Sequence, residues 1–288
     1  MKAAIIGANG QLGSDLAAEF GSRGWTVAGL THEDIVVEEF GTVSDVVNAL
    51  RPDVVLNTAA FHVVPRCEED PVRAYRVNAL GALNVARVCS GLDVPCVYYS
   101  TDYVFDGAQR IPYTETDRPN PLNVYAVTKL AGEQYTLNYA TKGVVLRVSG
   151  IYGRIPCRAK GGNFITTMIK ASRVKPEVRV LTDEILSPTP TRAIAEKTVE
   201  LLNHGATGLY HVASEGYCSW FEFARVVFDT LGLTTPLLQA SVKDFPVTVR
   251  RPTYSALRNT RLASEGFRPM PGWRESLVDF LRSNHFDS

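Results

Sequence analysis

Short apolar runs alternate with helical patterns along the first half of the chain. The apolar runs, each expected to form a strand, are Ala3–Ile6, Thr26–Leu30, Val54–Asn57, Cys96–Tyr99 and Val144–Val148. The segments between them show helical periodicity and are Leu12–Phe20, Val43–Leu50, Val72–Cys89 and Val124–Tyr139. Strands that alternate with helices predict a parallel sheet covered on both faces. We therefore expect an α/β fold built on a Rossmann-type, doubly wound parallel sheet.

The regular alternation weakens after Val148. Helices are expected at Phe164–Ala171, Arg192–Leu202, Trp220–Leu231 and Trp273–Leu281, with a strand at Leu209–Val212. We expect residues 1–150 to form the Rossmann domain. Residues 151–288 are expected to form mainly a smaller C-terminal domain, with segments that return to the first. Ligands of such sheets bind beyond the carboxyl ends of the strands, so the site is expected in the cleft between the two parts.

A glycine-rich turn follows the first expected strand directly. Gly7, Gly10 and Gly13 are spaced G-x-x-G-x-x-G and lead into a helical pattern. Strand, glycine turn and helix are the context in which a dinucleotide pyrophosphate sits at a helix N-terminus. A glycine turn can also simply join a strand to a helix. The second strand at Thr26–Leu30 favours binding of a dinucleotide cofactor.

Tyr125 and Lys129 are four residues apart in the expected helix, so their side chains share one helix face. A free tyrosine, with a pKa of about 10, is a poor acid-base catalyst near neutral pH. A neighbouring ammonium should lower the pKa of Tyr125 and bring proton transfer within range. Thr101 follows an apolar strand, where its hydroxyl could point at a substrate oxygen. A solvated helix face is the alternative interpretation of the Tyr-x-x-x-Lys spacing.

Composition excludes several classes of partner for this chain of 288 residues. The formal net charge is zero, so we expect neither nucleic acid nor an anionic membrane as a partner. No apolar segment has membrane-spanning length, and no secretory signal is expected. The five cysteines are widely spaced, which favours free thiols in a reducing, cytoplasmic environment. The five histidines have no metal-ligand spacing, so no metal site is expected.

Several longer motifs accompany the glycine turn and the Tyr-x-x-x-Lys pair. They are Arg51–Asn57, Asn78–Gly81, Ser100–Gly107 (Ser-Thr-Asp-Tyr-Val-Phe-Asp-Gly), Pro121–Tyr125, Gly162–Phe164, Ser187–Thr189, Gly208–His211 and Arg250–Pro252. With these motifs the chain resembles the extended short-chain dehydrogenases/reductases. Within that superfamily it is similar to the dTDP-4-dehydrorhamnose reductases over nearly its whole length.

The resemblance implies a set of site residues. It makes Thr101, Tyr125 and Lys129 the catalytic group and adds Asp102 and Asn163 as substrate contacts. The implied cofactor contacts are Gly7, Gly10, Gln11 and Leu12 for the pyrophosphate, Asp34 and Ile35 for the adenine, Ala59, Ala60 and Phe61 for the ribose path, Tyr99 for the nicotinamide end, and Tyr125 and Lys129. Asn78 matches the helix asparagine that supports the site in this superfamily.

The activity implied by the resemblance is reduction of the 4-keto group of a nucleotide sugar by NADPH or NADH. The expected reaction converts dTDP-4-dehydro-L-rhamnose to dTDP-L-rhamnose, a precursor of cell-surface polysaccharide. The resemblance is also compatible with a homodimer. Two alternatives stay open: a reductase or epimerase of another nucleotide sugar, and a non-catalytic protein similar to the regulatory subunit of methionine adenosyltransferase. Retention of Thr101, Tyr125 and Lys129 favours an enzyme.

Three positions depart from the family pattern. Gly150 stands where the reductases usually have tryptophan, and Val64-Pro65 replaces the usual Val-Asp pair. These two changes bear on which sugar is bound. No arginine follows the second strand, where Thr31 and His32 stand, so neither NADPH nor NADH is clearly favoured. The arginines of Arg250-Arg251, Arg258 and Arg261 suit either a solvated surface or a diphosphate.

Overall fold

The computed structural model describes residues 1–157, 161–246, 248–284 and 286. Its centre is a six-stranded sheet in the order β2-β1-β3-β4-β5-β8, and every neighbouring pair is parallel. The strands are β1 (Lys2–Ile6), β2 (Thr26–Leu30), β3 (Val54–Asn57), β4 (Cys96–Thr101), β5 (Gly143–Val148) and β8 (Gly208–His211). This arrangement confirms the expected Rossmann-type parallel sheet.

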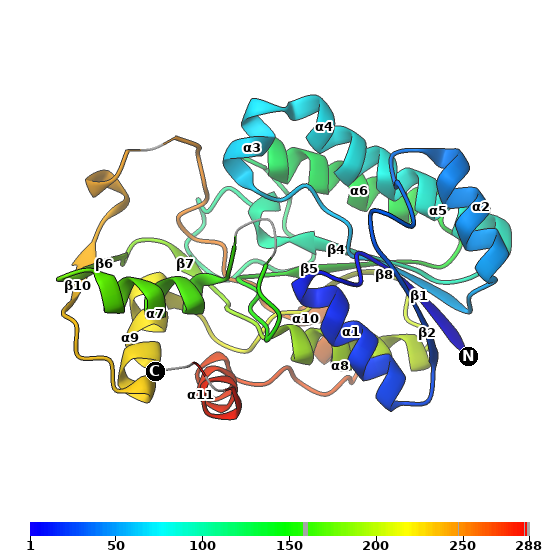
Figure 1. Ribbon diagram of the computed structural model, residues 1–288. Helices are drawn as coiled ribbons and strands as arrows, with labels where there is room; N and C mark the ends of the chain where they lie inside the picture. The colour runs from blue at the N-terminus through cyan, green and yellow to red at the C-terminus, as the bar shows by residue number, and fades with distance from the viewer. Residues whose placement is uncertain (158–160, 247, 285, 287–288) are drawn as a thin grey trace.

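Helices cover both faces of this sheet (Figure 1). One face carries α1 (Gln11–Ser22) and α8 (Thr191–Asn203), and the other carries α2 (Phe40–Leu50), α5 (Gly81–Leu92) and α6 (Val124–Tyr139). The strands are therefore buried on both sides, which explains why they appear in the sequence as continuous apolar runs. Within the described residues, no helix is both long and apolar enough to cross a membrane.

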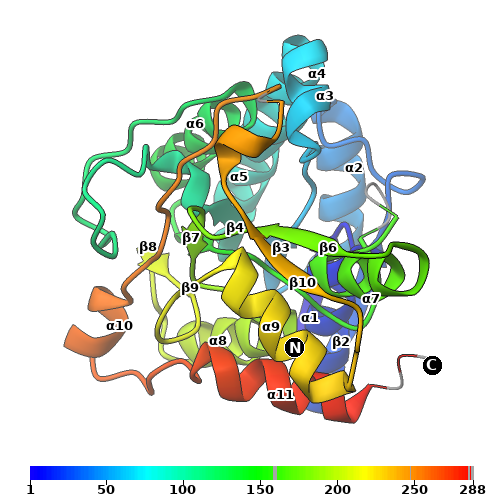
Figure 2. The same cartoon turned by 90° about the vertical axis from the view of Figure 1, so that its left-hand side faces the viewer.

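A smaller lobe lies beside one end of the sheet (Figures 1 and 2). Its parallel pair is β6 (Val178–Leu181) and β10 (Leu237–Ala240), packed with α7 (Phe164–Val174), α9 (Trp220–Leu231) and α11 (Trp273–Ser283). Further short elements are the antiparallel β7 (Ile185–Leu186) and β9 (Cys218–Ser219), and the 3-10 turns η2 (Asp102–Val104) and η4 (Val242–Asp244). Strand β8 and helix α8 lie after residue 150 in the sequence but belong to the main sheet and to the helices that cover it. The domain division at residue 150 therefore stays a prediction.

The expected helix Val72–Cys89 is not one continuous α-helix. The chain forms α3 (Val64–Glu69), α4 (Pro71–Tyr75), the π-helical turn η1 (Arg76–Leu80) and then α5. Periodicity alone does not predict the wider turn, which residues distant in the sequence contact. The Tyr98 hydroxyl donates a hydrogen bond to the Asn78 carbonyl (2.9 Å), and the Asn78 amide holds the backbone of Phe61. Such π-turns are frequently found at functional sites.

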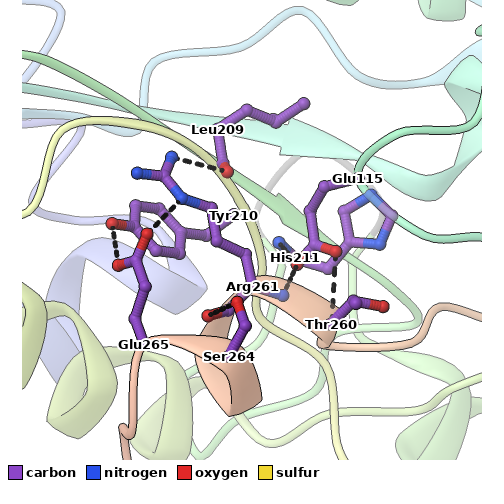
Figure 3. Close-up of polar contacts among 8 residues, drawn as sticks. All are labelled: Glu115, Leu209, Tyr210, His211, Thr260, Arg261, Ser264 and Glu265. Atoms are coloured by element: carbon purple, nitrogen blue, oxygen red, sulfur yellow. Dashed lines mark hydrogen bonds and ion pairs between the residues drawn. The ribbon is translucent and has the colours of Figure 1, made fainter.

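The segment after β10 returns from the smaller lobe to the sheet and forms α10 (Thr260–Ser264) beside β8 (Figure 3), before the chain continues to α11. The Glu115 carboxylate accepts hydrogen bonds from the backbone N–H groups of His211 (3.1 Å), Thr260 (3.1 Å) and Arg261 (3.2 Å). The Arg261 guanidinium stacks on the ring of Tyr210, 4.1 Å from its centroid. Arg261 therefore has a structural role in this arrangement.

Replacing Glu115 with alanine is expected to destabilise the protein by about 1–2 kcal/mol, because backbone donors lose their acceptor in a half-buried place. Denaturant unfolding measures the effect. Glu196→Ala is the matched control, since Glu196 pairs with Arg192 at an exposed site and should cost well under 1 kcal/mol. Equal losses for the two variants would contradict the role given to Glu115.

Candidate functional site

The glycine turn leaves the N-terminus of α1 open for an anion. Gly7 has φ +82°, and a Cβ there would lie 2.6 Å from Thr58 Oγ1, so only glycine fits without strain. Gly10 is the N-cap of α1, and no side chain caps its first turn. Backbone N–H groups at an uncapped helix start are suited to phosphate. The local structure therefore fits the pyrophosphate of a dinucleotide.

Gln11 and Asn163 meet beside this turn. Gln11 donates to the carbonyl of Ile151 (3.2 Å) and accepts from the Asn163 amide (3.3 Å). Asn163 also caps α7, because its side chain accepts the N–H of Thr166 (3.0 Å). Asn163, expected as a substrate contact, thus connects the smaller lobe to the glycine turn.

The loops after β2 and β3 carry the remaining expected cofactor residues. Asp34 is exposed and accepts hydrogen bonds from the N–H and hydroxyl of Thr31, which lower its pKa. Ile35 is buried in the core beneath α2, so its side chain supports the loop. Ala59, Ala60 and Phe61 are half-buried. Asn78 fixes this loop, since its amide accepts from the Phe61 N–H (2.8 Å) and donates to the Phe61 carbonyl (2.9 Å).

Tyr125 lies in the first turn of α6, where Asn123 caps the helix by accepting the N–H of Ala126 (2.9 Å). Burial raises the pKa of Tyr125 above its ordinary value, and a hydrogen bond with the Thr101 side chain offsets only part of this. The expected lowering of the Tyr125 pKa by Lys129 is therefore wrong. The desolvation of the phenolate outweighs the effect of its neighbours. At neutral pH Tyr125 is protonated, as a proton donor must be.

Lys129 is almost fully buried one turn further along α6. Its Nζ lies 3.9 Å from the centroid of the Tyr98 ring, and Tyr98 was not among the residues expected from the sequence. Burial lowers the pKa of Lys129 to about 7, although the Glu133 carboxylate raises it in part. Lys129 can therefore change its charge near neutral pH.

Asp102 binds hydroxyl groups from three different segments. Its Oδ1 accepts from Thr101 (3.1 Å), and its Oδ2 accepts from Ser149 (2.8 Å) and Ser255 (2.5 Å). Burial raises the pKa of Asp102 to about 6, which these hydrogen bonds oppose. The Thr101 hydroxyl is hydrogen-bonded to Asp102 and also to Tyr125, so it must leave a present partner before it can donate to a substrate. Ser149 and Ser255 are site residues that the expectations omitted.

Glu133, one helical turn beyond Lys129 on α6, forms a buried ion pair with Arg147. Glu133 accepts two hydrogen bonds from Arg147 (2.9 and 2.7 Å) and one from the Ser100 hydroxyl (2.5 Å). Both charged side chains are at most 3% exposed. The sequence contained one signal for this pair, because Tyr125, Lys129 and Glu133 repeat at four-residue spacing. No sequence pattern pointed to Arg147 as the partner.

Neither Tyr99 nor position 150 can offer a side chain to a ligand without rearrangement. The Tyr99 ring lies in the core, with its hydroxyl 3.1 Å from that of Thr198 on α8, so only its backbone faces the strand end. Gly150 has φ +51°, and a Cβ there would lie 2.5 Å from Leu186 Cδ1. A side chain at position 150 is therefore strained, and a Gly150→Trp substitution is not a usable test of substrate binding.

These groups lie at the carboxyl edge of the sheet, where β4 and β5 end in Thr101 and Val148 and α6 begins. The site combines a protonated phenol, a buried amine, a hydroxyl and an anion-binding helix start. Together they suit proton donation to a carbonyl oxygen beside a dinucleotide cofactor.

Comparison with known proteins gives concordant matches. The family profile described as RmlD substrate binding domain matches residues 1–286. Spore coat polysaccharide biosynthesis protein SpsK of Bacillus subtilis is 35% identical over 281 residues, which cover 98% of this chain and 97% of SpsK. The dTDP-4-dehydrorhamnose reductase of Mycolicibacterium smegmatis is 34% identical, with 96% of this chain and 83% of the relative covered.

A solved structure agrees over the whole length. The dTDP-4-dehydrorhamnose reductase of Bacillus anthracis, crystallised in complex with NADP, superposes with a TM-score of 0.93 at 34% identity and covers 99% of both chains. The resemblance expected from the motifs is thus confirmed. By its sequence, its fold and the match of nearly its full length, the chain belongs to the RmlD substrate binding domain family of nucleotide-sugar reductases.

Proposed function

We propose that this protein is an oxidoreductase that uses NADPH or NADH to reduce the 4-keto group of a nucleotide sugar. The substrate favoured by its relatives is dTDP-4-dehydro-L-rhamnose, with dTDP-L-rhamnose as the product. The observation that carries this proposal is the hydrogen bond of Thr101, at the end of β4, with Tyr125, which shares α6 with Lys129, at the sheet edge that also carries the uncapped start of α1. We place the reaction in the cytoplasm, and a homodimer stays a prediction.

Each catalytic side chain has a distinct task in this proposal. A bound reduced nicotinamide supplies hydride to C4 of the sugar. Tyr125 donates its phenolic proton to the C4 oxygen, where negative charge would otherwise develop. Lys129 stabilises the phenolate left on Tyr125, and Thr101 orients the C4 oxygen once its hydroxyl turns from Asp102. Gly7, Gly10 and Leu12 provide the backbone surface for the pyrophosphate.

The test is oxidation of NADPH or NADH in the presence of a panel of 4-keto nucleotide sugars, followed spectrophotometrically. The proposal expects turnover with at least one dTDP-linked 4-keto sugar and a reduced sugar as the product. Cofactor binding without turnover on any member of the panel would contradict it and would favour a non-catalytic protein.

A second candidate is a reductase or epimerase of a different nucleotide sugar. Gly150 favours it, because the backbone there has φ +51° and excludes the tryptophan usual in the reductases. An indole buries some 150–250 Å² when it contacts a ligand, so its absence removes a large part of a small-molecule contact. Calorimetric titration with dTDP, UDP and GDP sugars separates the candidates. Tight binding that is selective for dTDP sugars would exclude substrates linked to UDP or GDP, and the turnover panel then separates one dTDP sugar from another.

NADPH and NADH are expected to bind with affinities within about tenfold of each other, a difference of about 1.4 kcal/mol. The reason lies in the loop after β2, where Thr31 and His32 offer no guanidinium for a 2′-phosphate. Asp34 is already engaged by Thr31 rather than free to bind a ribose hydroxyl. Fluorescence titration of both cofactors measures the ratio. A preference above about a hundredfold would show that another group, such as the exposed Arg66, reads the ribose.

A further inference from the structure

The Lys129 ammonium lies over the face of an aromatic ring. Its Nζ lies 3.9 Å from the centroid of Tyr98, close to the ideal position for a cation over an aromatic face. Both side chains are at most 2% exposed. Cation–π attraction is strongest when water is excluded, as it is here.

Glu133, the carboxylate that raises the Lys129 pKa, is already bound by other groups. Glu133 lies one helical turn beyond Lys129, but both its oxygens accept hydrogen bonds from Arg147, and Ser100 donates to one of them. None of the ion pairs found among the described residues includes Lys129. Glu133 therefore acts on Lys129 only at longer range, while the Tyr98 ring contacts it.

The position of the Tyr98 ring is defined from several sides. Its hydroxyl donates to the Asn78 carbonyl in the π-turn, 2.9 Å away. Gly132 lies directly against the ring, and a Cβ at this position would overlap the Tyr98 hydroxyl. Ala82 and Val145 complete the buried cluster around Tyr98. A ring held this firmly gives the ammonium a fixed place on the α6 face that also carries Tyr125.

We propose that Tyr98 is a positioning residue for Lys129: its ring face holds the ammonium in place beside Tyr125 and stabilises its charged form. The contact itself is independent of any reaction. Its consequence for catalysis rests on the proposed function, in which Lys129 acts as a cation. The other titratable groups around this place are Tyr125 and Glu133 on α6 and Arg147 on β5.

Nuclear magnetic resonance of protein with carbon-13-labelled lysine tests the contact without cofactor or substrate. The Lys129 signal is assigned from its loss in Lys129→Met. In the wild type, the Lys129 Cε protons should be shifted upfield by the ring current of Tyr98. Tyr98→Phe should keep this shift, whereas Tyr98→Leu should abolish it and lower the Lys129 pKa by about one unit.

Tyr99→Leu is the matched control, because Tyr99 is the next residue on β4 and its ring faces α8 on the other side of the sheet. It should leave the Lys129 signal unchanged. Thermal unfolding identifies variants that do not fold. Unshifted Cε protons in the wild type would overturn the proposal even if Tyr98→Leu failed to fold. Loss of the shift in a folded Tyr98→Phe would overturn it as well.

Binding of NADPH then connects the contact to the site. Above the Lys129 pKa, Tyr98→Leu should bind NADPH about tenfold more weakly, and Tyr98→Phe should stay within about twofold of wild type. Unchanged binding by Tyr98→Leu would overturn the stabilisation of the charged form. A wild type that binds NADPH but reduces no nucleotide sugar would contradict only the proposed function.

Discussion

Replacing Tyr125 with phenylalanine is expected to lower kcat by about a hundredfold to ten-thousandfold, the usual contribution of a general acid. The ring still packs at the start of α6, and only the proton donor is lost. The raised pKa of Tyr125 keeps it protonated at neutral pH, so the hydroxyl is the proton source that the variant lacks. Steady-state kinetics on the best substrate of the panel measures the loss. Cofactor affinity should change by less than about twofold.

Tyr103→Phe is the matched control for this experiment. Its ring meets that of Tyr125 edge to face, with the centroids 6.3 Å apart, but its hydroxyl has no assigned role. Tyr103→Phe should therefore retain turnover within a few-fold of wild type. Wild-type turnover by Tyr125→Phe would show that another group protonates the sugar oxygen. Equal losses in both variants would point to a packing effect instead.

Replacing Glu133 with glutamine is expected to destabilise the protein by about 3–5 kcal/mol. The substitution preserves shape but leaves the Arg147 guanidinium buried without its counter-ion, and uncompensated buried charges are costly. The Ser100 hydroxyl also loses a charged acceptor. Denaturant unfolding of the variant measures the change in the free energy of unfolding.

A double-mutant cycle separates the pair from its surroundings. Glu133→Gln combined with Arg147→Gln should lose less stability than the sum of the two single variants, because the second substitution removes the uncompensated charge. Glu196→Gln, at the exposed pair with Arg192, is the control and should change stability by less than about 1 kcal/mol. Strict additivity of the two buried substitutions would contradict a coupled pair.

The local features of this protein were determined by the sequence itself. The order of strands and helices in the first half follows from apolar periodicity, which depends only on neighbouring residues. The glycine turn of Gly7 and Gly10 and the shared face of Tyr125 and Lys129 follow from backbone geometry in the same way. These features were predicted correctly because each is contained within a few consecutive residues.

Tertiary structure decided which distant residues contact the site and how the pKa values of its side chains change. The Tyr98 ring beneath Lys129 and the π-turn at Asn78 each depend on a contact between segments far apart in the chain. Asp102 and Ser255 are 153 positions apart, yet they share a hydrogen bond. Burial, which no local pattern measures, raises the pKa of Tyr125 where the sequence predicted a decrease. A charge buried by folding loses hydration, and that loss depends on the whole fold rather than on the spacing of two residues.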